Sequence, residues 1–457
     1  MTKTTLRTSV THEIKRRVRS RALVPGDRLP SIRAFAREQN LSPSTVSEAY
    51  DLLVAEGVIF ARQGSGFYVA DRTQPFAVAE TGPQLDRSVD PLWVARQSID
   101  TGENIEKPGC GWLPADWMPV GSLRRAMRKQ ATFENHVLTN YGNAQGHIEL
   151  RQHIAQQGDP TDPNAVLLTG SGSQALDLIC RLMLRPGDTV LIDDPCYFNF
   201  NALLRAHQIN IVSVPFTTNG PDLDHFARIL TREKPRLYLT NSALHNPTGA
   251  TISQTTAQGV LNLTKAHDLL IVEDDIFSEF ESTPSPRLAS LDGMQRVLRI
   301  GSFSKTLSAS LRCGYIIARP DWIKALTDLQ VATNFGGPSP FVSSILHAAL
   351  TDGSYRKHMA TLHKRLGLAR TEAITKLETI GIKPTIQPRG GFYLWCELPA
   401  QTDAAKIAQA ALKQDLVLAP GNVFSASQSK TSFMRFNVSQ MQNDRCYEIL
   451  NTLLNET

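Results

Sequence analysis

The sequence contains no uninterrupted apolar run approaching the roughly 18 residues that a membrane-spanning helix needs. Its first residues, MTKTTLRTSV, lack the apolar segment of a secretory signal peptide. The six cysteines are scattered, with no C-x-x-C pair and no His/Cys cluster at zinc spacing. From these absences we expect a cytoplasmic protein in a reducing compartment, with no membrane contact and no metal site.

Charge is unequally distributed along the 457 residues. Residues 1–72 hold 12 Lys and Arg against 7 Asp and Glu, and this excess of +5 equals the net charge of the whole chain. A basic excess confined to one end favours a polyanionic partner there, although a solvated basic helix face would give the same count. The length is too great for one hydrophobic core, so we expect two or three domains.

Short helices and a hairpin are predicted for the basic segment. The first twenty residues show an apolar repeat at i, i+4 among basic residues, as on an amphipathic helix. Ser31 and Ser42 are each placed to cap a short helix, the first over Ile32–Gln39 and the second beginning at Pro43. The glycines of residues 63–66 predict a hairpin turn. Two short helices followed by a hairpin are typical of a winged helix-turn-helix.

Residues 8–71 resemble the winged helix of the GntR-type regulators. The resemblance rests on the motifs G-D-x-L-P-S-x-R, L-S-x-S-T-V, A-E-G and G-S-G, in that order. It implies a double-stranded DNA operator as partner, with Arg33 on a phosphate and the wing tip, Gln63 and Gly64, on the backbone or minor groove. The residues implied to face the major groove are Ser44, Thr45 and Ser47.

One departure from the GntR pattern concerns base recognition. Many of these regulators have arginines where this sequence has Pro43 and Ser47. Arginine bound to guanine is the most common specific contact to a base. We therefore expect base readout to differ, and the operator sequence does not follow from the resemblance.

A linker is predicted between the head and a second domain. Residues 73–88 contain two prolines and a glycine and show no sustained period. We place the DNA-binding head at 1–72, the linker at 73–90 and the second domain at 91–457.

The second domain alternates short apolar runs with segments of helical length. The expected strands lie at 165–169, 189–192, 209–214, 236–240, 269–272 and 297–300. This alternation is typical of an α/β fold with an open, mostly parallel or mixed sheet. Ligands of such sheets gather at the carboxyl ends of the strands.

The stretch GSFSKTLSASLRCGY, residues 301–315, follows the last of these runs. Lys305 stands there among hydroxyl groups, with Arg312 seven residues further on. A lysine can hold an aldehyde as a Schiff base, and serines and a guanidinium can bind a phosphate. Pyridoxal phosphate carries both groups. Taken alone, the stretch fits a polar loop with a solvated lysine equally well.

Five further positions carry compatible chemistry. Gly170–Gln174 opens a helix whose N–H groups and serines suit a phosphate. Tyr197 can lie flat on an aromatic ring, Asn246 can donate to a phenolate oxygen, and Asp274 can pair with a pyridinium nitrogen. Arg435 can bind a carboxylate bidentately. Each position also has an ordinary alternative. The helix start could bind no ligand, Tyr197 could be an ordinary buried tyrosine and Asn246 could belong to a plain tight turn. Asp274 could be a solvated acid, and Arg435 could form a structural ion pair.

The order and spacing of these residues resemble the fold-type I aminotransferases over almost all of residues 100–455. The resemblance implies a domain that binds pyridoxal phosphate, with a smaller C-terminal α+β subdomain over about 335–457. Lys305 would form the Schiff base, Asp274 would partner the pyridinium and Asn246 the ring oxygen, while Tyr197 would stack on the ring. The residues implied for the phosphate are Ser171, Gly172, Ser173, Ser302 and Arg312, with Ser304 as a further cofactor-binding residue.

The resemblance also implies roles outside the cofactor ring. Tyr141, in the motif Y-G-N-A-Q-G, would reach the phosphate of a neighbouring subunit, which implies a homodimer with shared sites. Arg435 would bind the carboxylate of a substrate or effector. The stretch P-R-G-G-F-Y at 388–393 matches the hairpin of the small subdomain.

One position breaks the aminotransferase pattern. The family usually has a tyrosine two or three residues after the pyridinium aspartate, with its hydroxyl bonded to the ring oxygen. Here those positions hold Ile276 and Phe277, and neither can donate a hydrogen bond. We expect the Schiff base to hold its proton more tightly in consequence, which makes fast turnover less assured.

The head, linker and aminotransferase-like body together resemble the MocR-type regulators. This implies a transcriptional regulator that senses a small amine or amino acid at its cofactor. An active aminotransferase with an accessory DNA-binding head is the alternative, and Phe277 weighs against it. A third hypothesis, that pyridoxal phosphate itself is the signal, fits the sequence equally well.

Overall fold

The computed structural model describes residues 3–19, 22–24, 26–62, 64–70, 89–100, 102, 105–129, 135–158, 160–399 and 402–456. The chain forms two compact units, one of residues 1–88 with 95–103 and the other of 89–94 with 104–457. The division falls inside helix α4 (Pro91–Asp100). Residues 71–88, most of the expected linker, lie outside the described residues, so the linker stays a prediction.

The described part of the N-terminal unit is a helical cluster followed by an antiparallel hairpin. Its elements are α1 (Lys3–Arg19), α2 (Ile32–Glu38), α3 (Pro43–Ala55), β1 (Ile59–Arg62) and β2 (Gly66–Val69). Ser31 and Ser42 accept backbone hydrogen bonds at the starts of α2 and α3, and Pro43 is the first residue of α3. The predicted winged helix-turn-helix is confirmed.

Tyr50 lies at the centre of this unit's core and is fully buried. Its ring meets those of Phe35 and Phe67 edge-on, at centroid distances of 6.0 and 5.0 Å. Its hydroxyl donates to the Pro30 carbonyl at 3.0 Å. One side chain thus joins α2, α3 and the hairpin, which fixes how α3 is presented.

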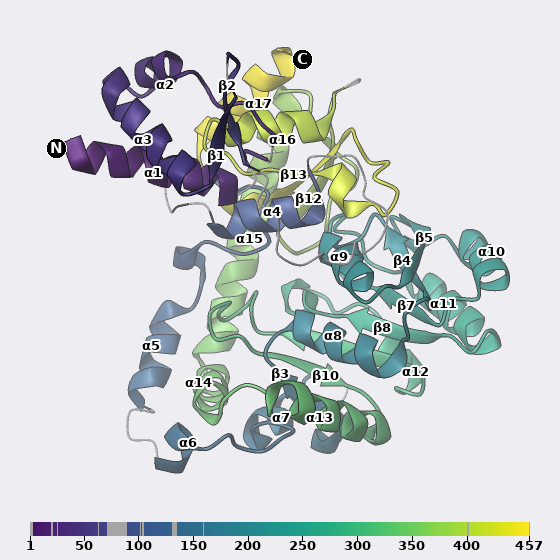
Figure 1. Cartoon of the computed structure of the whole chain (residues 1–457). Coiled ribbons are helices and arrows are strands. Elements are labelled where there is room, and N and C mark those ends of the chain that lie inside the picture. Colours follow the sequence, from purple (N-terminus) through teal and green to yellow (C-terminus); the bar gives the residue numbers. More distant parts are fainter. Residues whose placement is uncertain are drawn as a thin grey trace. The chain divides into compact units, whose positions relative to one another are not determined.

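The second unit is built on an eight-stranded sheet with the strand order β3-β10-β9-β8-β7-β4-β5-β6 (Figure 1). Pairing is parallel from β5 through β4, β7 and β8 to β9, and antiparallel where β10 and β6 join. The strands are β3 (Val166–Thr169), β4 (Thr189–Asp194), β5 (Asn210–Thr217), β6 (Gly220–Pro221), β7 (Leu237–Thr240), β8 (Leu270–Asp274), β9 (Val297–Ser302) and β10 (Gly314–Ile317). The predicted mixed α/β sheet is confirmed, although β10 was not foreseen.

Both faces of this sheet are buried because successive residues of a strand point to opposite sides. Val190 and Ile192 of β4 belong to one apolar cluster, together with Ile179 of α8 (Gly172–Met183). Leu191, between them, belongs to another cluster, with Val260 of α11 (Gln254–Ala266). Most of the strands therefore read as largely apolar runs, and polar residues are concentrated where the strands end.

Helices connect and cover the strands. They are η1 (Ala115–Trp117), α5 (Val120–Lys129), α6 (Asn135–Thr139), α7 (Ile148–Ala155), η2 (Pro163–Ala165), α8 (Gly172–Met183), α9 (Phe198–Ala206), α10 (Leu223–Glu233), α11 (Gln254–Ala266), η3 (Ser278–Phe280), α12 (Leu288–Asp292), α13 (Pro320–Asn334) and α14 (Pro340–Thr351). No helix of the described residues combines the length and apolarity needed to cross a membrane.

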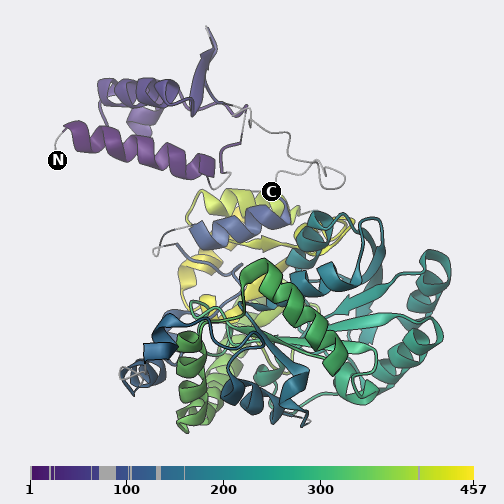
Figure 2. The same ribbon diagram turned by 60° about the horizontal axis from the view of Figure 1, so that its bottom comes forward.

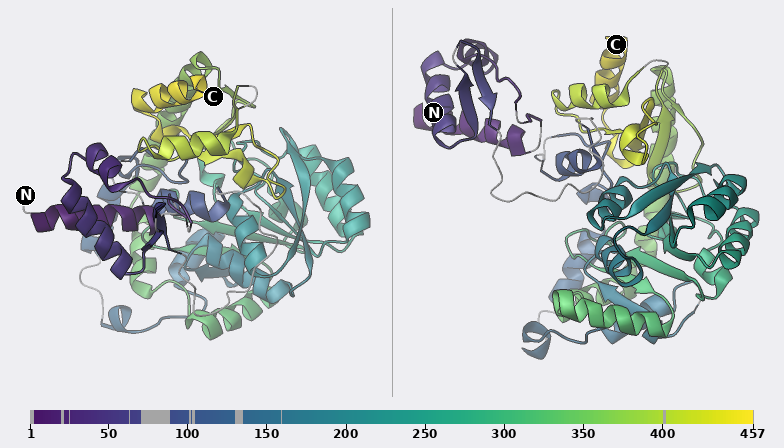
Figure 3. Two further views of the ribbon diagram at one scale, coloured as in Figure 1. Left: turned by 45° about the horizontal axis from the view of Figure 1, so that its top comes forward. Right: turned by 45° about the vertical axis from the view of Figure 1, so that its right-hand side comes forward.

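The C-terminal part forms a smaller α+β subdomain, as predicted. Its four-stranded antiparallel sheet has the order β11-β12-β14-β13. Figures 2 and 3 show these yellow and yellow-green elements gathered at one end of the teal and green body. The elements are α15 (Ser354–Thr379), β11 (Lys383–Pro384), β12 (Tyr393–Glu397), α16 (Ala404–Leu412), β13 (Ala419–Pro420), η4 (Gly421–Phe424), β14 (Phe433–Asn437), η5 (Val438–Gln440) and α17 (Asp444–Asn455).

Candidate functional site

Lys305 lies in the turn that follows β9, at the carboxyl edge of the parallel strands. Its side chain is partly buried, and its Nζ donates to the Gly111 carbonyl at 2.5 Å. Burial lowers the pKa of this ammonium to about 8, with Arg435 and Arg312 adding to the effect. At neutral pH a larger share of this amine is neutral than in an ordinary lysine, which suits a nucleophile that attacks an aldehyde.

Asp274 is the last residue of β8, the neighbour of β9 in the sheet. Its side chain is buried, and its Oδ1 accepts the Ile276 N–H at 3.2 Å. Burial raises the pKa of this carboxyl to about 7, although the hydrogen bond and the charge of Lys305 oppose the shift. A cation placed beside this carboxyl would stabilise its ionised form, and a protonated pyridine ring is such a cation.

Arg435 and Asn246 are joined by a hydrogen bond between their side chains. Arg435 belongs to β14 of the small subdomain and is 1% exposed. Its Nη1 donates to Asn246 Oδ1 at 2.9 Å, and its Nη2 donates to the Gly109 carbonyl at 2.6 Å. Its Nε is buried without a partner, and none of the described carboxylates forms an ion pair with it. The ion pair considered as its ordinary alternative is therefore absent from the described residues.

Tyr197 precedes helix α9 and is partly buried. Burial raises the pKa of its hydroxyl, the charge of Asp274 adds to this, and Arg435 opposes it. Its ring packs against Phe198 and Phe200 at centroid distances of 5.0 and 5.4 Å. Tyr197 thus lies where the charges of Asp274 and Arg435 both act, as a residue stacked on a bound ring would.

The residues expected at a phosphate meet at the start of α8. Ser171 caps this helix by accepting the Gln174 N–H at 3.0 Å. A Cβ added to Gly172 would lie 3.8 Å from the Cβ of Ser302, so the helix start and the end of β9 are in contact across a glycine. The Ser302 hydroxyl donates to Ser304 Oγ (3.0 Å) and also lies 3.1 Å from the Cys313 carbonyl.

Two of the expected phosphate residues are open to solvent. Ser173, in the first turn of α8, is exposed, and so is Arg312, whose φ of +46° is left-handed. An exposed hydroxyl and guanidinium beside a helix N-terminus fit a phosphate bound at the mouth of the site. The donor set present in the chain therefore suits the phosphate group.

Tyr141 is the one expected cofactor residue that the structure does not bring into this group. It is 75% exposed and packs against the ring of Phe335 at 4.8 Å. This placement is compatible with the expectation that it serves a neighbouring subunit.

Two residues near Lys305 were not singled out in the sequence. Gly111 accepts from the lysine, and no motif marked the segment before η1. Tyr393 lies beside Arg435, whose guanidinium carbon is 4.3 Å from its ring centroid. Tyr393 is the last residue of the hairpin motif P-R-G-G-F-Y, so the motif contained a signal for it.

The DNA-binding residues divide into accessible and enclosed ones. Arg33 and Ser44 are exposed, and Ser47 is partly exposed. Thr45 is only 3% exposed and its hydroxyl lies 2.7 Å from that of Ser42, so it completes the cap of α3 and does not face DNA as expected. Gly64 turns the hairpin with a φ of +72°. Gln63 lies outside the described residues.

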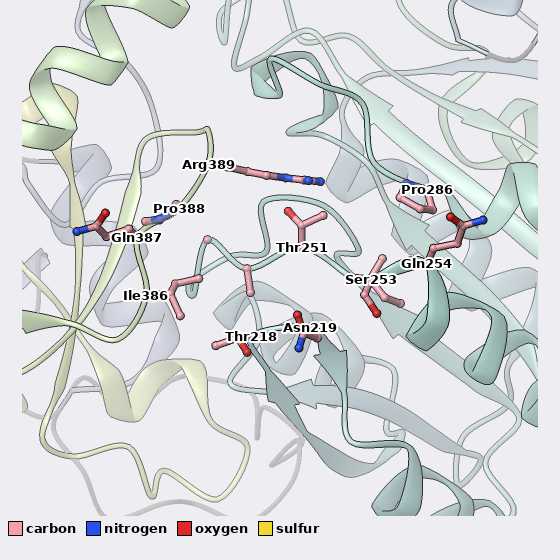
Figure 4. A pocket seen from close by; sticks show the side chains of 13 residues that line it. Thr218, Asn219, Thr251, Ser253, Gln254, Pro286, Ile386, Gln387, Pro388 and Arg389 are labelled. Carbon is pink, nitrogen blue, oxygen red and sulfur yellow. The ribbon is translucent and has the colours of Figure 1, made fainter.

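A cavity of about 470 Å³ lies elsewhere in this unit (Figure 4). It is bordered by residues 218–219, 249–254 and 386–389, and none of the expected site residues lines it. Arg389 lines it and forms an ion pair with Glu281 at 3.0 Å. That carboxylate also pairs with Arg287, and the cavity shares no residue with the site described above. The described residues also contain no cluster of His, Cys, Asp or Glu suited to a metal ion.

Comparison with known families agrees with this arrangement. The family described as "Aminotransferase class I and II" matches residues 115–453. The chain belongs to this family. Ahead of that region, residues 6–69 match the "Bacterial regulatory proteins, gntR family".

Curated relatives align across both parts of this aminotransferase-family chain. The HTH-type transcriptional regulator YdcR of Escherichia coli (strain K12) is 28% identical over 448 residues, covering 95% of each chain. YdfD of Bacillus subtilis (strain 168), another HTH-type transcriptional regulator, is 27% identical and covers 94% of this chain and 91% of its own. The chain is therefore a transcriptional regulator with an aminotransferase-like domain, consistent with the MocR type.

Solved aminotransferases share the fold of the second unit. LysN, the alpha-aminoadipate aminotransferase of Thermus thermophilus, aligns with a TM-score of 0.73 and 24% identity, over 79% of this chain and 94% of its own. The kynurenine aminotransferase of Pyrococcus horikoshii aligns with a TM-score of 0.71 and 23% identity, over 78% and 91%. Family membership and the fitting donor set make pyridoxal phosphate the cofactor.

The lowered pKa of Lys305 predicts how cofactor loading depends on pH. Only the neutral amine attacks an aldehyde, so the rate of attachment should rise with pH and level off above about pH 8. An ordinary lysine would still be gaining rate about two pH units higher. Stopped-flow absorbance after mixing cofactor-free protein with pyridoxal phosphate measures this. A rate still rising steeply at about pH 10, the ordinary lysine range, would show that burial does not lower the pKa.

Proposed function

We propose that this regulator binds its DNA operator through residues 1–72 and changes its action when a small amine or amino acid binds at the cofactor attached to Lys305. The observation that carries the proposal is the convergence of Lys305, Asp274, Asn246 and Arg435 in one unit of a chain whose other unit is a winged helix-turn-helix. Regulation of DNA binding implies a cytoplasmic protein.

Each residue has a definite part in holding the cofactor. Lys305 would be the attachment point for the aldehyde, Asp274 would pair with the ring nitrogen and Asn246 would bond the ring oxygen, while Tyr197 would lie against the ring. The cofactor supplies an aldehyde that exchanges with free amines and a ring that withdraws electrons. The phosphate is held by Ser171, Gly172, Ser173, Ser302 and Arg312, with Ser304 beside them.

Arg435 gives the site a preference for carboxylates. Both of its Nη groups now bond neutral oxygens, on Asn246 and Gly109, and its Nε is buried with no partner. A buried guanidinium without a counterion gains strongly from a carboxylate, which accepts two parallel hydrogen bonds. An amino acid offers that carboxylate together with the amine that Lys305 chemistry requires.

The surface around Tyr141 supports a homodimer with shared sites. Tyr141 and Phe335 are 75% and 64% exposed and touch each other, and exposed Leu138 and Phe341 lie on the neighbouring helices α6 and α14. An exposed apolar cluster of this kind marks a protein interface. With the cluster covered by a second copy, Tyr141 would be placed to reach that copy's phosphate.

The ligand would change DNA binding because its contacts with the protein differ between two conformational states. A ligand shifts a conformational equilibrium only by the difference in its affinity for the two states. Arg435 belongs to the small subdomain, whereas Lys305 and Asp274 belong to the large sheet. An amino acid held by both parts would favour one arrangement of the two parts over others.

Replacing Arg33 with alanine tests the DNA-binding head. Arg33 is exposed in the first turn of α2, and a phosphate contact there would be independent of base sequence. We expect weaker binding to every duplex and a salt dependence shallower by about 0.9 in the log–log slope. Fluorescence anisotropy with several duplexes at a series of salt concentrations measures both.

The matched control removes the same charge from the other unit. Arg232 of α10 has an 86% exposed side chain, and Arg232→Ala should leave both affinity and slope unchanged. If Arg33→Ala instead alters the preference among duplexes, the residue reads bases and its assigned role is wrong.

An active aminotransferase is the second candidate function. This function is favoured by the presence of Lys305, the buried Asp274 carboxyl and the Asn246 amide in one unit, because these are the residues expected to bind the cofactor. Phe277, which provides no hydroxyl, weighs against fast turnover. A protein that responds to pyridoxal phosphate itself is a third candidate, distinguished by a lack of response to amines.

A further inference from the structure

Phe277 stands where the aminotransferases usually have a tyrosine, and its side chain cannot donate the hydrogen bond that the tyrosine would make to the ring oxygen of the cofactor. Its ring is 3% exposed and lies among aromatic side chains, 5.6 Å from Phe392 and 5.5 Å from Tyr393, both met edge-on. The ring fills the space with carbon and hydrogen only. Any phenol that serves the cofactor must therefore come from a different element.

Tyr393, which touches Phe277, points its hydroxyl toward Lys305. A Cβ built on Gly111 would lie 3.1 Å from the Tyr393 hydroxyl and 3.7 Å from the Lys305 Nζ. Both groups thus lie over the same face of Gly111, and because that residue is a glycine no side chain separates them. Any larger residue at position 111 would crowd both the phenol and the amine.

The Tyr393 side chain is held firmly, yet its hydroxyl has no partner among the described residues. It begins β12, pairs in register with Asn437 of β14, and is 4% exposed. The Arg435 guanidinium lies 4.3 Å from its ring centroid and Phe277 meets the ring edge-on. No hydrogen bond within the described part of the chain engages its hydroxyl, so the hydroxyl is available to donate to a bound group.

The phenol stays protonated and so remains a donor. Burial raises the pKa of Tyr393 above its usual value, and the nearby Arg435 only partly opposes this. A neutral phenol that is fixed in place and lies beside the lysine is suited to bond a group that arrives with the cofactor.

We propose that Tyr393 supplies the phenol that Phe277 lacks, donating a hydrogen bond to the cofactor oxygen next to the point of attachment at Lys305. This inference rests on the proposed attachment of the cofactor to Lys305. A donor to that oxygen stabilises its anionic form and weakens its hold on the proton shared with the lysine nitrogen. The proton is then released at lower pH than Phe277 alone would lead one to expect.

The contact between Tyr393 and Arg435 also links the part of the site that would bind an amine with the part that would bind a carboxylate. Tyr393 and Arg435 lie on adjacent strands of the small subdomain, and the guanidinium covers the face of the phenol ring. A carboxylate that draws Arg435 toward itself would shift the phenol relative to Lys305. Ligand binding would therefore change the cofactor's absorbance through Tyr393.

The test is a pH titration of the visible absorbance band in the cofactor-loaded, full-length protein and its Tyr393→Phe variant. We expect the midpoint of the variant to rise by about one pH unit or more, which is a roughly tenfold tighter hold on the proton. Because the hydroxyl has no partner in the described part of the chain, its removal breaks none of the hydrogen bonds seen there. Tyr447→Phe is the matched control, since its hydroxyl bonds the Met441 carbonyl, and its midpoint should be unchanged.

A second variant tests the same point by gain of function. Phe277→Tyr, made in the Tyr393→Phe background, should lower the midpoint again by returning a phenol to the site. Equal midpoints in the wild type and Tyr393→Phe would overturn the inference while leaving the proposed function standing. A wild-type protein in which borohydride reduction fails to fix the cofactor on Lys305 would overturn both.

Discussion

Lys305→Ala is expected to lose the visible absorbance of the attached cofactor completely while remaining folded. In the proposed attachment the Nζ atom meets the aldehyde, and in the structure its hydrogen bond goes to the Gly111 carbonyl. The serines at α8 and β9 and the carboxyl of Asp274 are unaffected, so pyridoxal phosphate should still bind without a covalent bond. Spectra recorded before and after borohydride reduction, with mass mapping of the label, measure the loss.

Two controls separate chemistry from folding in this experiment. Lys305→Arg retains a cation but cannot form the same bond to an aldehyde, so it should behave like the alanine variant. Lys265→Ala, in the last turn of α11, removes a lysine outside the site and should load normally. A label that persists in Lys305→Ala, attached to another lysine, would contradict the assignment.

Arg435→Ala is expected to weaken an amino-acid ligand by about 2–5 kcal/mol while leaving the cofactor bound. This corresponds to a loss of affinity between roughly 30-fold and several thousand-fold. The size follows from burial, because the guanidinium is 1% exposed and the carboxylate would lose its counterion where water cannot replace it. Titration of the visible band with the ligand gives the affinity of each variant.

The ligand itself provides the sharpest control for Arg435. A decarboxylated analogue keeps the amine and should bind wild-type and Arg435→Ala protein equally well. Arg435→Lys should fall between the two, since an ammonium cannot make two parallel hydrogen bonds to a carboxylate. Equal affinities of the wild type and Arg435→Ala for the amino acid would place the carboxylate elsewhere. Asn246 also loses a donor in the variant, so thermal unfolding should accompany the titration.

Much of the site is predictable from the sequence because parallel strands end at one edge. Asp274 ends β8 and Lys305 follows β9, and these two strands are neighbours in the sheet. An apolar run followed by polar residues marks such an end in the sequence alone. The helix starts at Ser31, Ser42 and Ser171 are predictable for a similar local reason, since a cap and its partner are three residues apart.

The remaining contacts depend on residues that are far apart in the chain. Arg435 reaches Asn246 across 189 residues and the Gly109 carbonyl across 326. Lys305 reaches Gly111 across 194 residues, through a carbonyl group that every residue has. No local pattern encodes such pairs, so Gly111 became visible only in the fold, and the hairpin motif marked Tyr393 without revealing what it contacts. Strand β10 was missed because it is short and begins at a glycine, Gly314, which lets the strand approach the backbone of Ser171.

Thr45 shows where a family pattern misleads about a single side chain. The motif L-S-x-S-T-V places it among residues expected to face DNA. In the structure its hydroxyl completes the cap with Ser42, because a threonine at the third position of a helix turns back toward the capping residue. Of the three side chains expected at the major groove, Ser44 and Ser47 remain accessible.

The most direct test of the account is a visible absorbance titration of the cofactor-loaded, full-length protein with a panel of amino acids and amines, followed by a keto acid. We expect one ligand to shift the band in proportion to its binding and the shifted band then to persist, as in a sensor that binds without turnover. Conversion to the amine form of the cofactor, reversed by the keto acid, would contradict this and identify a working aminotransferase. A band indifferent to every amine would contradict amine sensing and leave pyridoxal phosphate as the signal.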